Sequence, residues 1–227
     1  MIKAVFFDWG DTLAVINYRS ADISKKLDDI LAPYNLNWEK FFPYWKNFSL
    51  LRSKGDIKSD EEMFLQLNRV LQKEIPLQKI RETRFNNHFV SKENIEVIKK
   101  LKEKYKVGVL SNGVKDWVEG VMKRYGINNL FDSVIISSEV GIRKPDAEIY
   151  YIALKSLSLK PQETIFVSDE VCDDLVGAKG CGIKTIWLDT GNDDEWKKKE
   201  REIAKVFKPD AVIKNLKEVI TIIKIMQ

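Results

Sequence analysis

An apolar run near the start of the chain, Ala4 to Phe7, stops abruptly at an acidic turn that contains Asp8 and Asp11. The run is rich in β-branched and aromatic residues, which predicts a strand buried on both faces, as in a parallel sheet. Open α/β sheets bind their ligands beyond the carboxyl ends of such strands, so Asp8 is in a position to do chemistry. The alternative is a simple turn or cap, for which Asp, Gly and Thr are also common.

Two further segments place polar groups where a ligand could use them. The apolar run 106–110 is followed by Ser111 and Asn112, a hydroxyl and an amide that precede a predicted helix. A phosphoryl oxygen would fit there, because the free amides of a helix start attract anions. Lys144 lies beside Pro145, a residue suited to the first position of another helix. Each segment taken alone is also common at an ordinary turn or surface.

The most acidic segment of the chain follows the apolar run 164–167. Residues 168–174 read Ser-Asp-Glu-Val-Cys-Asp-Asp, with four acids in six positions from Asp169 to Asp174. Acids at a helix start can merely complement the helix dipole. This group, however, ends a strand that is expected to share a sheet with Asp8, so we expect the two to lie close together.

The elements that would position these residues alternate between strand and helix from residue 91 onward. Strands are predicted at 106–110, 133–137, 164–168, 184–188 and 211–213. Helices are predicted at about 115–125, 146–157, 173–181, 194–206 and 215–225. Such alternation implies right-handed crossovers, and therefore an α/β fold with a doubly wound parallel sheet.

Helical periodicity alone fills residues 20–89, which predicts an inserted α-helical cap. Ser59 and Glu62 form the pattern of a capping box at the start of one of its helices. The predicted division of the chain is a core domain of residues 1–14 and 91–227 and a cap domain of residues 15–90.

Two sets of side chains in the predicted cap could bear on a substrate. The aromatic residues are Trp38, Phe41, Phe42, Tyr44, Trp45 and Phe48. They could roof a site, but we favour packing between cap helices. The arginines that could meet an anionic group are Arg19, Arg52 and Arg81, and each also fits an exposed position. We expect His88, the sole histidine, to be structural or exposed.

The composition is that of an ordinary globular protein, with 44% hydrophobic and 32% charged residues and a net charge of +4. The apolar runs are too short to span a bilayer, and the acid at position 8 does not fit a signal peptide. The lysines are spread without arginine-rich blocks, which argues against nucleic acid as a partner. Cys172 and Cys181 fit neither a CxxC nor a zinc pattern. We expect a cytoplasmic protein with reduced thiols, without a membrane or nucleic-acid partner, and either monomeric or homodimeric.

In type and order, Asp8, Ser111, Lys144 and Asp169 resemble the motifs of the haloacid dehalogenase superfamily. That resemblance covers the whole chain and implies a Rossmann-like core with a helical C1-type cap. It further implies that Asp8 is a nucleophile and that Ser111 and Lys144 bind and neutralise the transferring group.

The same resemblance implies a magnesium site. Asp8, the backbone carbonyl of Gly10 and Asp169 would coordinate Mg²⁺, while Asp174 or Asp173 would hold metal-bound water or orient its neighbours. The implied activity is the hydrolysis of a small phosphorylated metabolite through an aspartyl-phosphate intermediate. The chemistry is reasonable, because a carboxylate nucleophile divides one hard displacement into two easier steps and magnesium removes charge repulsion.

One position departs from the phosphatases of this superfamily, which usually carry a second Asp two residues after the nucleophile. Here that residue is Gly10, and Asp11 is a candidate substitute for the missing general acid. Two alternatives follow. A 2-haloacid dehalogenase also lacks the second Asp, but four clustered acids suit it less well than they suit magnesium. A binding or regulatory protein that has kept the fold and lost turnover is the other.

Overall fold

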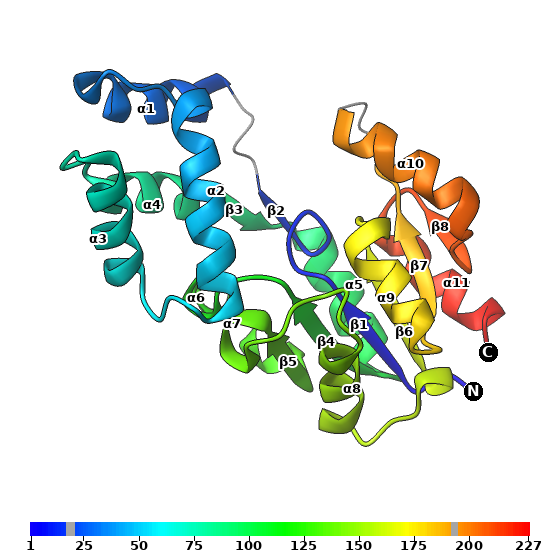
Figure 1. The fold of residues 1–227 in the computed structure, drawn as a ribbon. Helices are drawn as coiled ribbons and strands as arrows, with labels where there is room; N and C mark the ends of the chain where they lie inside the picture. Colours follow the sequence, from blue (N-terminus) through cyan, green and yellow to red (C-terminus); the bar gives the residue numbers. More distant parts are fainter. Residues whose placement is uncertain (17–20, 192–194) are drawn as a thin grey trace.

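The computed structural model describes residues 1–16, 21–191 and 195–227, which form a helix-covered sheet and a separate group of helices (Figure 1). Within these residues the larger sheet has six parallel strands in the order β5-β4-β1-β6-β7-β8. Its strands are β1 Ala4–Phe7, β4 Lys106–Ser111, β5 Ser133–Ile136, β6 Thr164–Ser168, β7 Lys184–Leu188 and β8 Ala211–Ile213. The predicted doubly wound α/β architecture is confirmed.

The first strand of the chain lies in the middle of this sheet, and all four of its residues are buried, as its continuous apolar sequence favours. Phe7 pairs with Val109 of β4 on one side and Val167 of β6 on the other. The carboxyl ends of the three strands therefore meet at one edge. Gly108 allows this close packing, since a Cβ there would overlap the ring of Phe6.

Helices cover both faces of the sheet, as alternating side chains require. Val5 and Phe7 pack into one apolar cluster with α5, α6 and α11, whereas Ala4 and Phe6 pack into another with α8, α9 and α10. The bounds of these helices are α5 Lys92–Lys102, α6 Lys115–Tyr125, α8 Ala147–Ser156, α9 Val176–Gly180, α10 Glu195–Phe207 and α11 Val219–Ile225. The short helix α7, Ser137–Val140, follows β5.

Four helices between the first strand and α5 form a group of their own, here named the helical insert (Figure 1). They are α1 Ala21–Leu31, α2 Trp38–Lys54, α3 Asp60–Leu71 and α4 Leu77–Asn86. An antiparallel pair of short strands, β2 Ala14–Ile16 and β3 His88–Val90, joins the insert to the sheet domain. The insert has its own apolar core, in which Phe41 and Trp45 are almost completely buried, as expected for helix packing.

Local details differ from the sequence-based predictions. The β2–β3 pair was not predicted, because strands of three residues are too short for a periodic signal. The helix predicted from residue 173 begins instead as a π-helical turn, Val171–Leu175. Ser59 does cap α3, but the carboxylate of Glu62 accepts the N–H of Lys58 rather than that of Ser59. In the described segments, none of the helices combines the length and apolarity that crossing a bilayer would require.

The packing of the insert makes neighbouring phenylalanines unequal. Phe41 is fully buried, whereas the side chain of Phe42 is 37% exposed. We expect Phe41→Ala to lower the free energy of unfolding by about 3–5 kcal/mol, the range for a large aromatic core residue. Phe42→Ala should cost under about 1 kcal/mol. Urea unfolding of both variants tests this, and equal losses would contradict the packing described here.

Candidate active site

A buried lysine joins two strand ends at the carboxyl edge of the sheet. The Nζ atom of Lys144 lies 2.6 Å from Oδ1 of Asp8 and 2.7 Å from Oδ2 of Asp174. Only 3% of Lys144 is exposed, so its charge depends on these carboxylates rather than on water. Ser168, the last residue of β6, donates its hydroxyl to the same oxygen of Asp174 at 2.6 Å.

The backbone of Lys144 is held by the turn that follows β4. Asn112 donates its side-chain amide to the carbonyl of Lys144 at 3.0 Å and accepts the Lys144 N–H at 2.8 Å. The sequence analysis assigned the side chain of Asn112 to substrate binding. Both ends of the amide are occupied, and their effect is to position Lys144, so substrate binding by Asn112 stays a prediction.

Both carboxyl oxygens of Asp169 are engaged by other residues of the chain. The hydroxyl of Thr12 donates to Oδ1 at 3.0 Å and accepts the N–H of Asp169 at the same distance. Lys197 donates its ammonium to Oδ2 and also to the backbone carbonyl of Asp169, at 2.9 Å. Lys197 belongs to α10 and is 8% exposed. Its place in a run of three lysines gave no signal that it would turn inward.

The helix α10 makes a second contact with the acidic segment after β6. The Oε2 atom of Glu200 accepts the backbone N–H groups of Val171 and Cys172. Glu200 is fully buried and lies one turn after Lys197. The start of the π-helical turn is therefore held by a side chain that sequence patterns did not single out.

Burial and crowding raise the proton affinity of the carboxyl groups. Burial raises the pKa of Asp8 to about 7, with Asp174 and Asp169 adding to this and Lys144 opposing it. Burial, assisted by Asp174 and Asp8, raises the pKa of Glu170 to about 9. Lys144 behaves in the opposite sense: burial disfavours its charge, but Asp174 and Asp8 outweigh burial and raise its pKa. The negative charge of these carboxylates, if all were ionised, would therefore exceed the positive charge that the lysines of the site supply.

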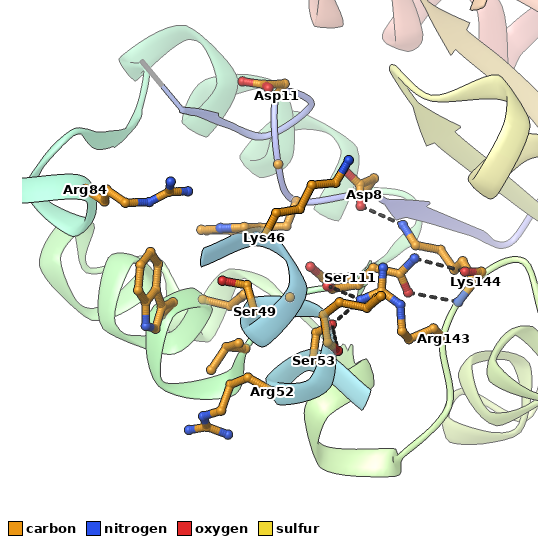
Figure 2. Close-up of a pocket in the computed structure, with 18 of the residues that line it drawn as sticks. Asp8, Asp11, Lys46, Ser49, Arg52, Ser53, Arg84, Ser111, Arg143 and Lys144 are labelled. Atoms are coloured by element: carbon orange, nitrogen blue, oxygen red, sulfur yellow. Dashed lines mark hydrogen bonds and ion pairs between the residues drawn. The ribbon is translucent and has the colours of Figure 1, made fainter. Parts of the chain in front are cut away.

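A cavity of about 660 Å³ opens over these groups, between the sheet edge and the helical insert. Eight residues that the sequence assigned to the site line it: Asp8, Gly10, Asp11, Ser111, Asn112, Lys144, Asp169 and Asp174. Asp173, which the sequence left open as the alternative to Asp174, is not among the lining residues. From α2 of the insert, the side chain of Lys46 extends toward Asp8 (Figure 2). Trp45 and Trp117 add apolar surface to the same wall.

Asp11 differs from the other predicted residues in its orientation. It is exposed, its φ is 52°, and its carboxylate is directed away from Asp8 (Figure 2). Adjacent side chains at the end of a strand diverge, so the one-residue offset from Gly10 matters. The structure does not bring Asp11 to the reacting group, and its suggested role as general acid stays a prediction.

The described arginines considered as anion ligands form ion pairs with acidic residues, and Arg52 also lines the cavity. Arg52 lies 3.0 Å from Asp116 and 3.6 Å from Asp60, and Arg81 lies 2.5 Å from Asp60. Arg19 lies outside the described residues. Arg143 was not predicted, yet it donates to the hydroxyl of Ser53 in α2 and to the carbonyl of Asn112. Arg143 thus connects the insert to the sheet edge beside the cavity.

The chemistry of the donors fits a hard divalent cation. Asp8 and Asp169 follow adjacent strands and present carboxylate oxygens to one cavity, which Gly10 also lines. In the described part of the chain, no three His, Cys, Asp or Glu side chains are grouped as a metal cage. Magnesium does not need such a cage, because it is commonly bound by one or two carboxylates and keeps several waters. The crowded negative charge around Asp8 would attract such a cation.

The family model described as haloacid dehalogenase-like hydrolase matches residues 52–188, more than half of the 227 residues. The chain belongs to the haloacid dehalogenase-like hydrolases. The family resemblance found in the sequence is confirmed, and the protein is a hydrolase of this family.

Several curated relatives are named glyceraldehyde 3-phosphate phosphatase, two of which illustrate the match. The protein of Pyrococcus furiosus is 33% identical over 125 residues, which are 54% of this chain and 49% of the relative. This hydrolase therefore aligns with about half of that relative's length. The protein of Methanothermobacter thermautotrophicus is 28% identical over 213 residues, covering 84% of this chain and 87% of the relative.

Solved structures of the family share the fold. A Bacteroides thetaiotaomicron family enzyme, solved with magnesium and inorganic phosphate, has a TM-score of 0.67 and 21% identity over 86% of this chain and 98% of its own. A 2-haloacid dehalogenase of Pseudomonas syringae pv. Tomato has a TM-score of 0.70 and 20% identity over the full length of both chains. At these identities the likeness establishes the architecture of this hydrolase and does not separate the two chemistries.

The sole histidine generates a prediction about acid stability. His88 is 6% exposed and packs edge-on against Trp117, and burial, with Arg84 and Arg124, lowers its pKa to about 4. In the folded protein, His88 therefore stays neutral at pH values between about 6.5 and 4, whereas in the unfolded chain it binds a proton below about pH 6.5. Stability should be complete above that pH and fall by about 3 kcal/mol as the pH drops to 4. Urea unfolding across this range should give a shallower decline for His88→Gln, and an identical decline would exclude this role.

Proposed function

We propose that this hydrolase is a magnesium-dependent phosphatase that cleaves a small phosphomonoester through an aspartyl-phosphate on Asp8. The observation that carries the proposal is the contact of 2.6 Å between Asp8 and the buried ammonium of Lys144, in a cavity that Ser111 and Asp169 also line. A carboxylate held beside a fixed positive charge is suited to attack an anionic phosphoryl group.

Each residue has a distinct part in the proposed reaction. Lys144 holds Oδ1 of Asp8, so we assign the attack on phosphorus to Oδ2. Ser111, 4% exposed at the end of β4, and Lys144 would bind the phosphoryl oxygens. Asp174 keeps Lys144 charged and in place, so we assign it to orienting a neighbour rather than to holding a metal.

The residues that would hold Mg²⁺ are Asp8, Asp169 and the backbone carbonyl of Gly10. When bound, the ion would supply positive charge that offsets the repulsion between the nucleophile and an anionic phosphoryl group. The relatives named as phosphatases and a magnesium-bound structure of the same fold support this part of the proposal.

We assign the substrate to a chemical class and not to a single compound. Among the described residues, the cavity lining combines Lys46 with the aromatic side chains of Trp45 and Trp117. A small phosphorylated metabolite, as in the names of the relatives, fits a cavity of about 660 Å³. We propose that residues 15–90 act as the cap that covers it, on a core domain of residues 1–14 and 91–227. Two unpaired cysteines support a cytoplasmic location.

Nucleophilic attack by Asp8 predicts that Asp8→Asn abolishes magnesium-dependent hydrolysis of p-nitrophenyl phosphate, with a loss of at least about 10³-fold. The matched control is Asp29→Asn, which changes an exposed residue of α1 and should leave the rate unaltered. The rate is measured with and without a chelator on wild type and both variants. Turnover that ignores the chelator, or release of chloride from 2-chloropropionate, would favour the dehalogenase instead. A panel of phosphorylated metabolites then ranks the substrates.

The glycine at position 10 predicts a dependence on the leaving group. Without a general acid, the rate should fall steeply as the pKa of the departing alcohol rises. Gly10→Asp should accelerate esters of poor leaving groups about tenfold to a hundredfold and change p-nitrophenyl phosphate little. Asp11→Asn should leave the slope unchanged, because its carboxylate is directed away from Asp8. A steeper slope in Asp11→Asn would instead identify Asp11 as the acid.

A further inference from the structure

Helix α10 contacts the acidic segment after β6 through two buried side chains of opposite charge. Lys197 donates to Oδ2 and to the backbone carbonyl of Asp169, and Glu200 accepts the N–H groups of Val171 and Cys172. The two side chains are 8% and 0% exposed. Residues three apart lie on one face of a helix, so α10 is attached to this segment by both signs of charge.

The contact at Asp169 conflicts with the proposed binding of a cation. Thr12 occupies Oδ1 of Asp169, and the ammonium of Lys197 occupies Oδ2. An oxygen that accepts from an ammonium at contact distance cannot at the same time be fully available to a metal ion. The ammonium of Lys197 also repels a cation held at the same carboxylate.

We propose that Lys197 is the counter-ion of Asp169 in the metal-free protein, and that a divalent cation binds by displacing its ammonium. The inference rests on the proposed function, since it assigns the cation to Asp169. Displacement removes the bond of Lys197 to Oδ2 of Asp169 and so weakens the attachment in the first turn of α10, while Glu200 keeps its contacts one turn later. Cation binding is thereby coupled to release of the start of α10.

The coupling has two measurable consequences. Lys197 stabilises the metal-free protein because it neutralises a carboxylate that is 4% exposed. It also lowers the affinity for the cation, because its bond to Asp169 must be broken first. Removing the ammonium should therefore weaken the metal-free fold and strengthen metal binding.

The experiment compares Mg²⁺ binding to wild type and to Lys197→Met by titration calorimetry, which needs no turnover. We expect the dissociation constant of the variant to be about tenfold lower or more, and its metal-free melting temperature to be lower. Lys197→Arg keeps the charge and should bind no more tightly than wild type. The matched control is Lys198→Met, which removes a neighbouring lysine that is 55% exposed and paired with Glu195.

Hydrogen exchange on the unmodified protein gives a second readout that does not depend on the fold of any variant. Addition of Mg²⁺ should speed exchange of the amides that donate to the first-turn carbonyls of α10, relative to the amides of its last turn. Equal or weaker Mg²⁺ binding by Lys197→Met, or unchanged exchange in α10, would overturn the inference and leave the phosphatase proposal standing. Absence of Mg²⁺ binding to every protein would overturn both.

Discussion

The buried ammonium of Lys144 is the interaction on which the arrangement of the site depends. A lysine that is 3% exposed stays charged only if carboxylates replace its water, and here Asp8 and Asp174 do so. Breaking one partner of a buried ion pair typically costs about 3–5 kcal/mol, because the other charge is left uncompensated. The segments after β1 and β6 are therefore tied to Lys144, while Asn112 after β4 holds the lysine backbone.

Charge balance explains the remaining contacts around this centre. Asp169 lies 4% exposed near Asp8, and it is satisfied by Thr12 from the first turn and by Lys197 from α10. Burial and neighbouring carboxylates hold the pKa of Glu170 at about 9, so this acid is neutral at physiological pH. Each acidic side chain is thus paired, protonated or poised to accept a cation. In the metal-free protein, Lys144 and Lys197 thus already neutralise part of the negative charge of the site.

The helical insert covers the crevice that the strand ends leave open. Strand ends alone form an open crevice, but α2 brings Lys46 toward Asp8 (Figure 2). Trp45 of the same helix also lines the resulting cavity of about 660 Å³. Arg143, between Ser53 of the insert and the carbonyl of Asn112, links this roof to the segment that positions Lys144. The contact between Arg143 and Ser53 of the helical insert is therefore linked, through Asn112, to the position of Lys144.

The sequence alone determined the parallel sheet, the helical insert and the polar residues at the strand ends that line the cavity, because each of these polar groups follows directly on an apolar run. Local patterns could not assign partners, since these depend on segments that are far apart in the chain. Only the tertiary structure turned Asn112 toward the Lys144 backbone, directed Asp11 away from Asp8, and brought Lys197 from a run of three lysines to Asp169. Neighbouring residues determine whether a segment forms a strand. The partner of a buried charge, in contrast, depends on which distant segment the fold brings next to it.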